Sequence, residues 1–377
     1  MKKHLAIFAL ACGTAAALNA MGSDSWGSAP GAVFAATNDV AHNEVVMYSR
    51  SETGQLKLIG SFATGGRGEG GINDPLQAES SIALTGDHRY LLAVNAGSSN
   101  ISVFQVSPTG LTLIEKKSTE GGNPVSVTIH DDLVYVANVG GTYHTAGFHL
   151  QPWGGLKFIQ NSKQPLSFLD TEPGMIALSP DGSKLIVTER QTSKIDVFSV
   201  ASDGSLTNPV VNNDQGIEPF GATFTPSGAL LVTEAGSGAM SSYAINADNS
   251  LSVITSKAPA GGGATCWVVV AGQYAYASNS ISSNVALYAL GASGSLSALG
   301  IAVTEPTTVK AIFPPGIPIT SYPLDVAATA DNKFVYVVYS VLGKVIGYQI
   351  AADGTLTKVA SVSPYAPQIG VEGLAVY

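Results

Sequence analysis

The sequence predicts an all-β protein folded as a seven-bladed β-propeller, and three observations support this. An alternating segment that ends in an aromatic residue recurs seven times along the 377 residues. The aromatic residues are separated by 56, 44, 50, 45, 45 and 60 residues, close to the ~40 to 50 residues of a four-stranded blade. The 42 glycines, together with many β-branched and aromatic residues, favour turns and strands over long helices. The seven aromatic residues are Tyr48, Phe104, Phe148, Phe198, Tyr243, Tyr288 and Tyr348.

The first 20 residues are expected to form a secretory signal peptide. Two lysines follow Met1, an apolar stretch runs from Leu5 to Leu18, and Ala20 provides a small residue at its end. The stretch is shorter than the ~20 apolar residues that a membrane span needs. We therefore expect residues 21–377 to form one secreted propeller, periplasmic if the host is bacterial. A lipid anchor at Cys12 is the alternative.

Each complete repeat reads as four strands. In one of them, an apolar strand over Met175–Leu178 meets the turn Ser179–Gly182, and a second strand follows over Lys184–Thr188. A polar turn leads to the third strand, which ends at Phe198, and a glycine turn leads to a fourth, edge strand. Turns with Pro-Asp-Gly supply the tight reversals that antiparallel strands need.

The first repeat lacks its first strand. Residues 32–61 contain strands two to four, and the missing strand appears at the other end as Gly373–Tyr377. The C-terminal strand should therefore complete the N-terminal blade and close the ring, which removes open sheet edges. Two β-sandwiches would also give many short strands, but they explain neither the seven matching units nor the split one.

Charge and cysteine content narrow the class of protein. The chain has 18 Lys and Arg against 27 Asp and Glu, without a basic cluster, so nucleic acid is not an expected partner. Beyond the signal segment no apolar run is long enough for a membrane span. The expected mature chain keeps only Cys266, which excludes an intrachain disulfide. We expect a monomer that relies on its packed core.

The repeat register gathers polar residues on one face of the disc. In a blade, the first strand starts and the second strand ends on the same face, and the connections between blades also cross it. The insertions Ala63–Gln77 and Thr304–Tyr322 are such connections. We therefore predict a binding funnel on this face. Its candidate residues are Asn95, Asn138, Glu189, Glu234 and Asn279 at the ends of second strands, Trp267, Asp325 and Glu372 near the starts of first strands, and His144 and Arg190 in loops.

A purely architectural interpretation stands beside the functional one. Asparagine at a strand end often only bonds the following turn. Glu189 and Glu234 differ from the asparagines, because two carboxylates near one axis repel each other unless something binds them.

Several segments carry a family resemblance. Ser179–Gly182, Leu92–Ser98, Gly121–Ser126 and Ile195–Phe198 resemble the lactonase family of seven-bladed propellers, which includes propeller-type 6-phosphogluconolactonases and carboxymuconate cyclases. The resemblance spans residues 32–377, and Cys266-Trp267 is similar to secreted carboxymuconate cyclase-like members.

The resemblance implies a lactone-opening hydrolase or a cycloisomerase. It matches Glu234 to a glutamate of the family's site, but the expected Arg-His pair after the proline is here Phe220-Gly221. The acidic face would repel the anionic substrates of the family. A small neutral lactone or a sugar acid derivative is therefore the expected substrate.

Three interpretations remain open. In the first, Glu234 or Glu189 is a general base, Arg190 or His144 stabilises the oxyanion, and the other candidates hold the substrate. In the second, the glutamates and asparagines hold a divalent cation such as Ca²⁺; otherwise we expect no cofactor and assign no metal ligand. In the third, the chain is a non-catalytic secreted propeller that binds a carbohydrate or a protein. The residues expected to hold the substrate are Asn95, Asn138, Asn279, Trp267, Glu372 and Asp325.

Overall fold

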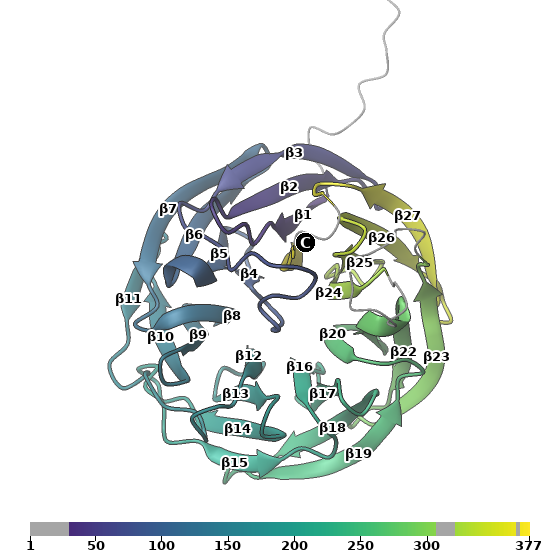
Figure 1. The fold of residues 1–377 in the computed structure, drawn as a ribbon. Coiled ribbons are helices and arrows are strands. Elements are labelled where there is room, and N and C mark those ends of the chain that lie inside the picture. Colours follow the sequence, from purple (N-terminus) through teal and green to yellow (C-terminus); the bar gives the residue numbers. More distant parts are fainter. Residues whose placement is uncertain (1–29, 307–320, 367–369) are drawn as a thin grey trace, which may run out of the picture.

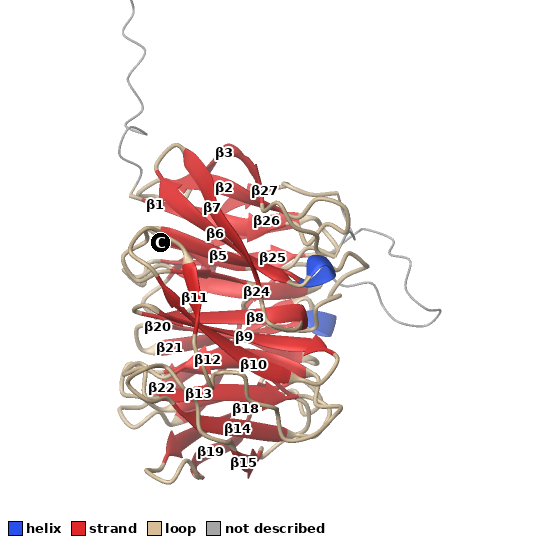
Figure 2. Cartoon of the chain, turned by 90° about the vertical axis from the view of Figure 1, so that its left-hand side faces the viewer, coloured by secondary structure: helices blue, strands red, loops and turns tan. Residues whose placement is uncertain are grey.

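Seven four-stranded antiparallel sheets surround a central axis, as the repeat predicted (Figures 1 and 2). The computed structural model describes residues 30–306, 321–366 and 370–377. The predicted signal peptide, the alternative anchor at Cys12 and most of the second insertion lie outside these residues.

The blades are numbered here in chain order, and each is given from the axis outward. Their strands are β28 (Leu374–Val376), β1 (Gly31–Ala36), β2 (Glu44–Arg50) and β3 (Leu56–Ala63) in blade 1; β4 (Ile82–Leu84), β5 (Tyr90–Asn95), β6 (Asn100–Ser107) and β7 (Gly110–Ser118) in blade 2; β8 (Gly122–His130), β9 (Leu133–Gly140), β10 (His144–Leu150) and β11 (Leu156–Phe158) in blade 3; β12 (Pro173–Leu178), β13 (Lys184–Glu189), β14 (Lys194–Ser199) and β15 (Val210–Asn213) in blade 4; β16 (Pro219–Phe224), β17 (Leu230–Glu234), β18 (Ala239–Ile245) and β19 (Leu251–Pro259) in blade 5; β20 (Thr265–Ala271), β21 (Tyr274–Asn279), β22 (Asn284–Leu290) and β23 (Leu296–Thr304) in blade 6; and β24 (Pro323–Ala328), β25 (Phe334–Tyr339), β26 (Lys344–Ile350) and β27 (Leu356–Val362) in blade 7.

The C-terminal strand closes the first blade, which confirms the predicted split. β28 pairs with β1 in antiparallel register, with Val33 opposite Val376. Ala32 and Tyr377 exchange backbone hydrogen bonds of 3.0 Å in both directions. The two ends of the described chain are thus held in one sheet, and the ring has no open edge on its inner side.

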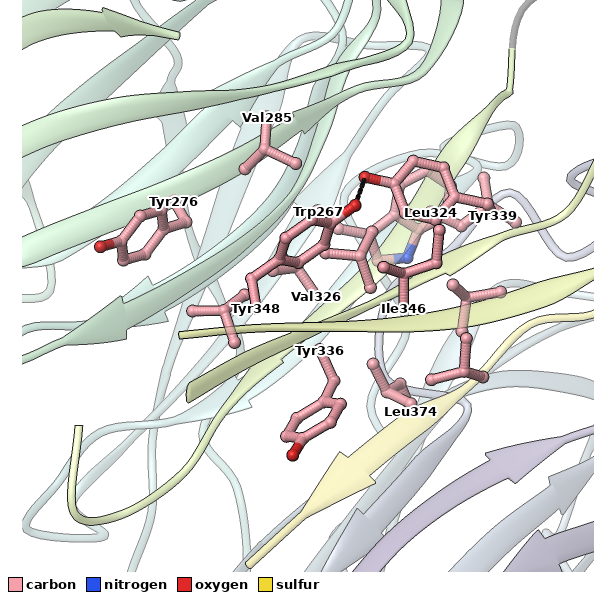
Figure 3. Close-up of a cluster of buried hydrophobic side chains, with 14 of the residues drawn as sticks. Trp267, Tyr276, Val285, Leu324, Val326, Tyr336, Tyr339, Ile346, Tyr348 and Leu374 are labelled. Carbon is pink, nitrogen blue, oxygen red and sulfur yellow. Dashed lines mark hydrogen bonds between the residues drawn. The ribbon is translucent and has the colours of Figure 1, made fainter. Parts of the chain in front are cut away.

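The core lies between neighbouring sheets. The second strands are buried along almost their whole length, the strands next to the axis are buried over part of theirs, and the outer strands alternate between half-buried and exposed residues. The cluster between blades 6, 7 and 1 contains Trp267, Tyr276, Tyr336 and Leu374 (Figure 3). Burial of such large side chains, each worth roughly 1.5–3 kcal/mol for a typical apolar residue, holds one blade to the next.

Buried tyrosines of the second strands also bond the neighbouring blade. The Tyr135 hydroxyl donates to the Gly204 carbonyl at 2.6 Å, and the Tyr276 hydroxyl donates to the Gly354 carbonyl at 2.8 Å. Each acceptor belongs to the turn between the third and fourth strands of the next blade. The same repeat position thus supplies both apolar area and a satisfied polar contact.

The first insertion crosses the centre of the disc, on the face where it was predicted (Figure 1). We call this the mouth face; it carries the connections between blades and the loops that join second to third strands. The β3–β4 connection reaches the inner strands of blades 3 and 4, because Ser126 Oγ donates to the Glu79 carbonyl at 2.6 Å and the Glu79 N–H donates to the Gly174 carbonyl at 2.7 Å. The connection therefore covers the axial opening.

Helix is almost absent from the described residues. They contain two 3₁₀ turns, η2 (Ala96–Ser98) and η3 (Ser280–Ser282), each between a second and a third strand. Within the same residues we find no helix of the length and apolarity that crossing a bilayer requires.

Candidate active site

The asparagines predicted at the ends of second strands join their blades to the incoming connections. Asn138 Nδ2 donates to the Thr119 carbonyl at 3.2 Å, and Asn279 Nδ2 donates to the Ala260 carbonyl at 3.1 Å. Asn95 Oδ1 accepts from Thr64 Oγ1 at 2.6 Å. All three asparagines are fully buried. Each amide thus stabilises the chain segment that enters its blade from the preceding one.

Glu189 occupies the same repeat position in blade 4 and binds the incoming connection with its carboxylate. Its oxygens accept from Ser167 N at 2.9 Å, Ser167 Oγ at 2.6 Å and Thr192 Oγ1 at 2.6 Å. Asp196 lies beside it, and burial together with the Glu189 charge raises the pKa of Asp196 to about 9. The Glu189 carboxylate therefore has its hydrogen bonds satisfied within the fold.

Glu234 occupies this position in blade 5 and is less well paired. Oε1 accepts from Ser241 Oγ, while Oε2 has no hydrogen-bond partner among the described residues. Burial raises the pKa of Glu234 to about 7. Its charged neighbours are Asp214 and Lys257, whereas Glu189 faces Asp196. The two glutamates thus have separate surroundings.

Four carboxyl groups meet at the axis under the β3–β4 connection. Two of them, Asp325 and Glu372, are among the predicted candidate residues, and two, Asp74 and Glu79, come from the β3–β4 connection. Asp325 Oδ2 accepts from Gly373 N at 2.9 Å, and Glu372 Oε2 accepts from Leu76 N at 2.9 Å. Asp74 and Glu372 share a hydrogen bond between their side chains.

Burial controls the protonation of this axial cluster. It raises the pKa of Asp325 to about 7, and it raises the pKa of Glu79 and of Glu372 well above their ordinary values. The charge of Asp74 raises the pKa of Glu372 further. The carboxyl groups of Asp325, Glu79 and Glu372 therefore hold their protons more tightly than exposed carboxyl groups do.

Trp267 and His144 are both buried, Trp267 in blade 6 and His144 at the start of β10 in blade 3. Trp267 packs on Phe220 with ring centroids 4.9 Å apart, and its indole N–H has no hydrogen-bond partner among the described residues. His144 Nδ1 lies 2.5 Å from the Thr142 carbonyl oxygen, and burial lowers the pKa of the imidazole. A side chain at Gly121 would collide with this ring, at 2.4 Å from its Cε1. His144 is thus neutral and enclosed at pH 7.

Glu79 explains why position 221 carries no side chain. A Cβ added to Gly221 would lie 2.2 Å from Glu79 Oε2. The Glu79 carboxylate also accepts from Val268 N at 3.2 Å. Glu79 and the Cys266 carbonyl oxygen, which would lie 2.4 Å from the same Cβ, thus fill the space that a residue such as histidine would need at position 221.

Arg190 brings a positive charge next to Phe220, the residue that precedes Gly221. It follows the last residue of β13, and its guanidinium carbon lies 5.5 Å from the centroid of the Phe220 ring. Nη2 donates to Glu172 Oε2 at 2.9 Å, and Nη1 lies 3.6 Å from Glu218 Oε1. The side chain is 8% exposed, and its Nε has no partner among the described residues. A buried cation between two carboxylates thus keeps an unused donor at Nε.

Glu172 and Glu218 stand at one repeat position, directly before the first strand of a blade. Their backbones are in the left-handed region, with φ of 47° and 60°, and each precedes a proline. Most residues avoid this conformation. Ala264 shares it with φ of 53°, so it is a property of how the connection enters a blade. The residues found at this position in blades 3 to 7 are Asn123, Glu172, Glu218, Ala264 and Tyr322.

A pocket opens where the β3–β4 connection meets blades 3 and 4. We call it the Arg190 pocket; its volume is about 210 Å³. The polar lining comes from six residues, and Pro75, Leu76, Val125, Val139 and Pro173 supply apolar walls. Of the ten candidate residues predicted from sequence, this pocket is lined by Arg190. The polar lining residues apart from Arg190 are Glu69, Gln77, Asn123, Tyr143 and Glu172.

Sequence reasoning missed Glu172, Glu218, Asp74 and Glu79 as site residues. Glu172-Pro173 and Glu218-Pro219 were visible as dipeptides at one repeat position, together with Asn123-Pro124 and Tyr322-Pro323. The insertion residues had no such signal, because their contacts depend on how the connection folds over the axis.

The described residues contain no group of three or more His, Cys, Asp or Glu side chains arranged to hold a metal ion. Cys266 lies 4% exposed beside the axial cluster, and burial raises the pKa of its thiol well above the ordinary value. A thiol in this state is a poor nucleophile.

Comparison with known proteins gives a family match. The model of the family described as lactonase, 7-bladed β-propeller, matches residues 41–151, 154–270 and 212–368. The fold is similar to the periplasmic gluconolactonase of Pseudomonas aeruginosa, with a TM-score of 0.71 and 17% identity over 92% of this chain and 98% of that one. A proposed 6-phosphogluconolactonase of Bacteroides uniformis gives 0.69 and 18%, over 92% and 99%. Virginiamycin B lyase of Staphylococcus aureus gives 0.53 and 14%, over 77% and 86%. The last relative shows that one architecture carries different reactions.

Proposed function

Because the chain belongs to the lactonase family of seven-bladed β-propellers, we propose that it opens the ring of a small neutral lactone in the Arg190 pocket. The observation that carries this proposal is a buried guanidinium that lines the pocket and whose Nε–H has no hydrogen-bond partner among the described residues. Such a group stabilises the negative charge that develops on a carbonyl oxygen when a nucleophile attacks.

The position of Arg190 compensates for the missing basic pair. The family resemblance implied Arg-His where this chain has Phe220-Gly221. Arg190 comes from blade 4 and places its charge over the Phe220 ring, 5.5 Å from the centroid. The positive charge is thus supplied from the neighbouring blade, and we propose that it serves the same purpose.

Glu172 is the proposed general base. Its side chain is 41% exposed, lines the pocket and bonds Arg190. In the proposed reaction, a water molecule attacks the lactone carbonyl carbon and gives one proton to Glu172. The tetrahedral intermediate then breaks its bond to the ring oxygen, and Glu172 returns the proton to that oxygen. One lactone and one water thus give one hydroxy acid.

Charge around the pocket favours a neutral substrate. Glu69 and Glu172 line it, and Glu218 lies 3.6 Å from Arg190 on the other side. One cation among three carboxylates leaves the site negative, which opposes entry of a phosphorylated or carboxylated lactone. A neutral sugar lactone such as a gluconolactone fits this balance.

We place this activity outside the cytoplasm. The charged start and apolar stretch of residues 1–20 support export, and one structural relative is periplasmic. Glu234 and Glu189 remain predicted alternatives to Glu172 as general base, and His144 remains a predicted alternative to Arg190 as the group that stabilises the oxyanion.

The test is hydrolysis of D-glucono-1,5-lactone in a pH-stat, with the spontaneous rate subtracted. We expect turnover by the parent protein and a loss of about 100-fold in kcat/KM in Arg190→Gln. The control is Arg89→Gln, which should leave the rate unchanged. Arg89 is an exposed arginine in the β4–β5 turn and does not line the Arg190 pocket. Absence of turnover with any neutral lactone, or full activity in Arg190→Gln, would contradict the proposal. Binding without turnover would favour the non-catalytic alternative.

A further inference from the structure

Large apolar side chains gather in the loops of the mouth face. Among the described residues, this face exposes six of them in its loops, whereas the loops of the opposite face expose Trp153. The remaining exposed apolar residues lie on outer strands. Exposed apolar groups concentrated on one face mark a binding surface. The six are Val40, Ile72, Phe168, Leu169, Ile217 and Ile281.

Phe168 and Leu169 lie on the connection that forms one wall of the Arg190 pocket. This connection is bonded to Tyr143 on both sides of them: Leu166 N donates to the Tyr143 carbonyl at 3.1 Å, and the Tyr143 hydroxyl donates to Asp170 Oδ1 at 3.3 Å. Phe168 is 58% exposed and Leu169 is 79% exposed. The two side chains therefore stand at the rim of the pocket rather than inside it.

Ile217 and Ile72 lie on two other connections that approach Arg190 or its pocket. Ile217 is 64% exposed and directly precedes Glu218, which faces Arg190. Ile72 is 58% exposed, and its carbonyl accepts from Asp74 N at 3.0 Å, next to the lining residue Pro75. Three different connections thus each place apolar area beside one polar pocket.

The size of the pocket limits what can enter it. At about 210 Å³ it is smaller than the ~300–1,000 Å³ of sites that enclose a drug-sized ligand. A lactone ring fits such a volume, but a substituent on the ring has to lie outside, across the rim. A sugar hydroxyl gains nothing from contact with Phe168, Leu169 and Ile217, whereas an alkyl chain does.

We propose that the natural substrate is an amphiphilic lactone, with its ring in the Arg190 pocket and its alkyl or acyl chain over Phe168, Leu169 and Ile217. This inference rests on the proposed lactonase function and specifies its substrate class. The ring carbonyl meets the guanidinium, and the chain leaves water against the rim. The polar interior and apolar border of the site then serve the two ends of one molecule.

The experiment compares δ-lactones that carry unbranched alkyl chains of increasing length. For the parent protein we expect kcat/KM to rise by about two- to fourfold with each methylene until the chain passes the rim. The double substitution Phe168→Ser with Leu169→Ser should flatten this dependence, so that kcat/KM for the long-chain δ-lactones falls to the value for the unsubstituted ring. Trp153→Ser, on the opposite face, should leave the dependence as it is in the parent.

Failure of this inference differs from failure of the proposed function. Turnover of D-glucono-1,5-lactone without any rise along the alkyl series would overturn the amphiphilic substrate and leave the lactonase standing. No turnover of any lactone would overturn both. A double variant that keeps the chain-length dependence, but differs from the parent in oligomeric state or in binding to lipid vesicles, would assign the rim to a partner surface and also overturn the inference.

Discussion

Glu172 and Glu189 both belong to blade 4, but their carboxylates differ in burial and in hydrogen bonding. Glu189 is fully buried and accepts three hydrogen bonds from Ser167 and Thr192. Glu172 is 41% exposed, lines a pocket and bonds Arg190. Burial with complete pairing makes a carboxylate a structural group, whereas partial exposure beside a cation leaves it available to a substrate.

Blade 5 repeats the comparison with a variation. Glu218 corresponds to Glu172, and Glu234 corresponds to Glu189. Glu234, however, keeps one oxygen without a partner among the described residues. Glu172 and Glu189 therefore differ clearly in hydrogen bonding, whereas Glu218 and Glu234 differ less. Glu234 is thus the residue that best tests whether a glutamate at the end of a second strand has only a structural role.

The largest expected effect is on stability, from Glu189→Ala. This change leaves the hydroxyl groups of Ser167 and Thr192 without their acceptor, keeps only Asp196 as acceptor for the Ser167 N–H, and opens a cavity between the blades. We expect the free energy of unfolding to fall by about 3 kcal/mol, measured by urea denaturation, while kcat/KM of the folded protein stays within threefold of the parent. Glu189→Gln, which keeps an acceptor and removes the repulsion with Asp196, should be close to the parent. If Glu189→Ala instead loses most of its activity and keeps the stability of the parent, Glu189 has a catalytic rather than a structural role.

The next effect is on activity, from Glu172→Gln. The amide cannot take a proton from water, so kcat should fall by about 30-fold, while the melting temperature changes little because the side chain is partly exposed. Glu218→Gln is the matched control in the next blade, since it also faces Arg190 but does not line the pocket. We expect it to lose less than fivefold. Equal losses in the two variants would show that the carboxylates only position Arg190.

A smaller effect concerns the pH dependence of stability at the axis. Burial raises the pKa of Asp325 to about 7, so the folded protein holds this proton more tightly than the unfolded chain does. The stability that this proton contributes is complete below the ordinary pKa of about 4, falls as the pH rises, and is lost above about pH 7. We expect Asp325→Asn to reduce the drop in melting temperature between pH 5 and pH 8 by about 3 °C. The drop should stay as large as in the parent if the Asp325 carboxyl is charged throughout.

The smallest expected effect is that of Glu234→Gln on catalysis. Burial raises the pKa of Glu234 to about 7, a value suited to a general base, yet this side chain does not line the Arg190 pocket. We expect kcat/KM at pH 7 to stay within twofold of the parent and the pH profile to keep its shape. If kcat/KM of the Glu234→Gln variant no longer changes with pH near pH 7, the general base is Glu234 and not Glu172.

The fold was accessible from sequence because it repeats. The spacing of Tyr48 to Tyr348 and the lone strand Gly373–Tyr377 already specify seven blades and the split one, and pairing of β28 with β1 confirms them. The axial position of Asp325 and Glu372 followed from the same register.

The site was less accessible because it depends on departures from the repeat. Arg190 follows a second strand at a position where blades 5, 6 and 7 have Ala235, Ser280 and Ser340, and this departure was visible. The Glu79 carboxylate beside Gly221 was not, because no pattern in the sequence says how an irregular connection crosses the axis. Contacts between distant segments, rather than local propensity, decided this part of the molecule.

The central claim is that substrate binds at Arg190, under the β3–β4 connection. A crystal structure with gluconolactam, in which an amide replaces the ester so that the ring is not hydrolysed, tests it directly. The account predicts the lactam in the pocket of Asn123, Tyr143 and Glu172, with its carbonyl oxygen within hydrogen-bond distance of the Arg190 guanidinium. A lactam bound between blades at Glu234, or on the face that carries Trp153, would contradict it.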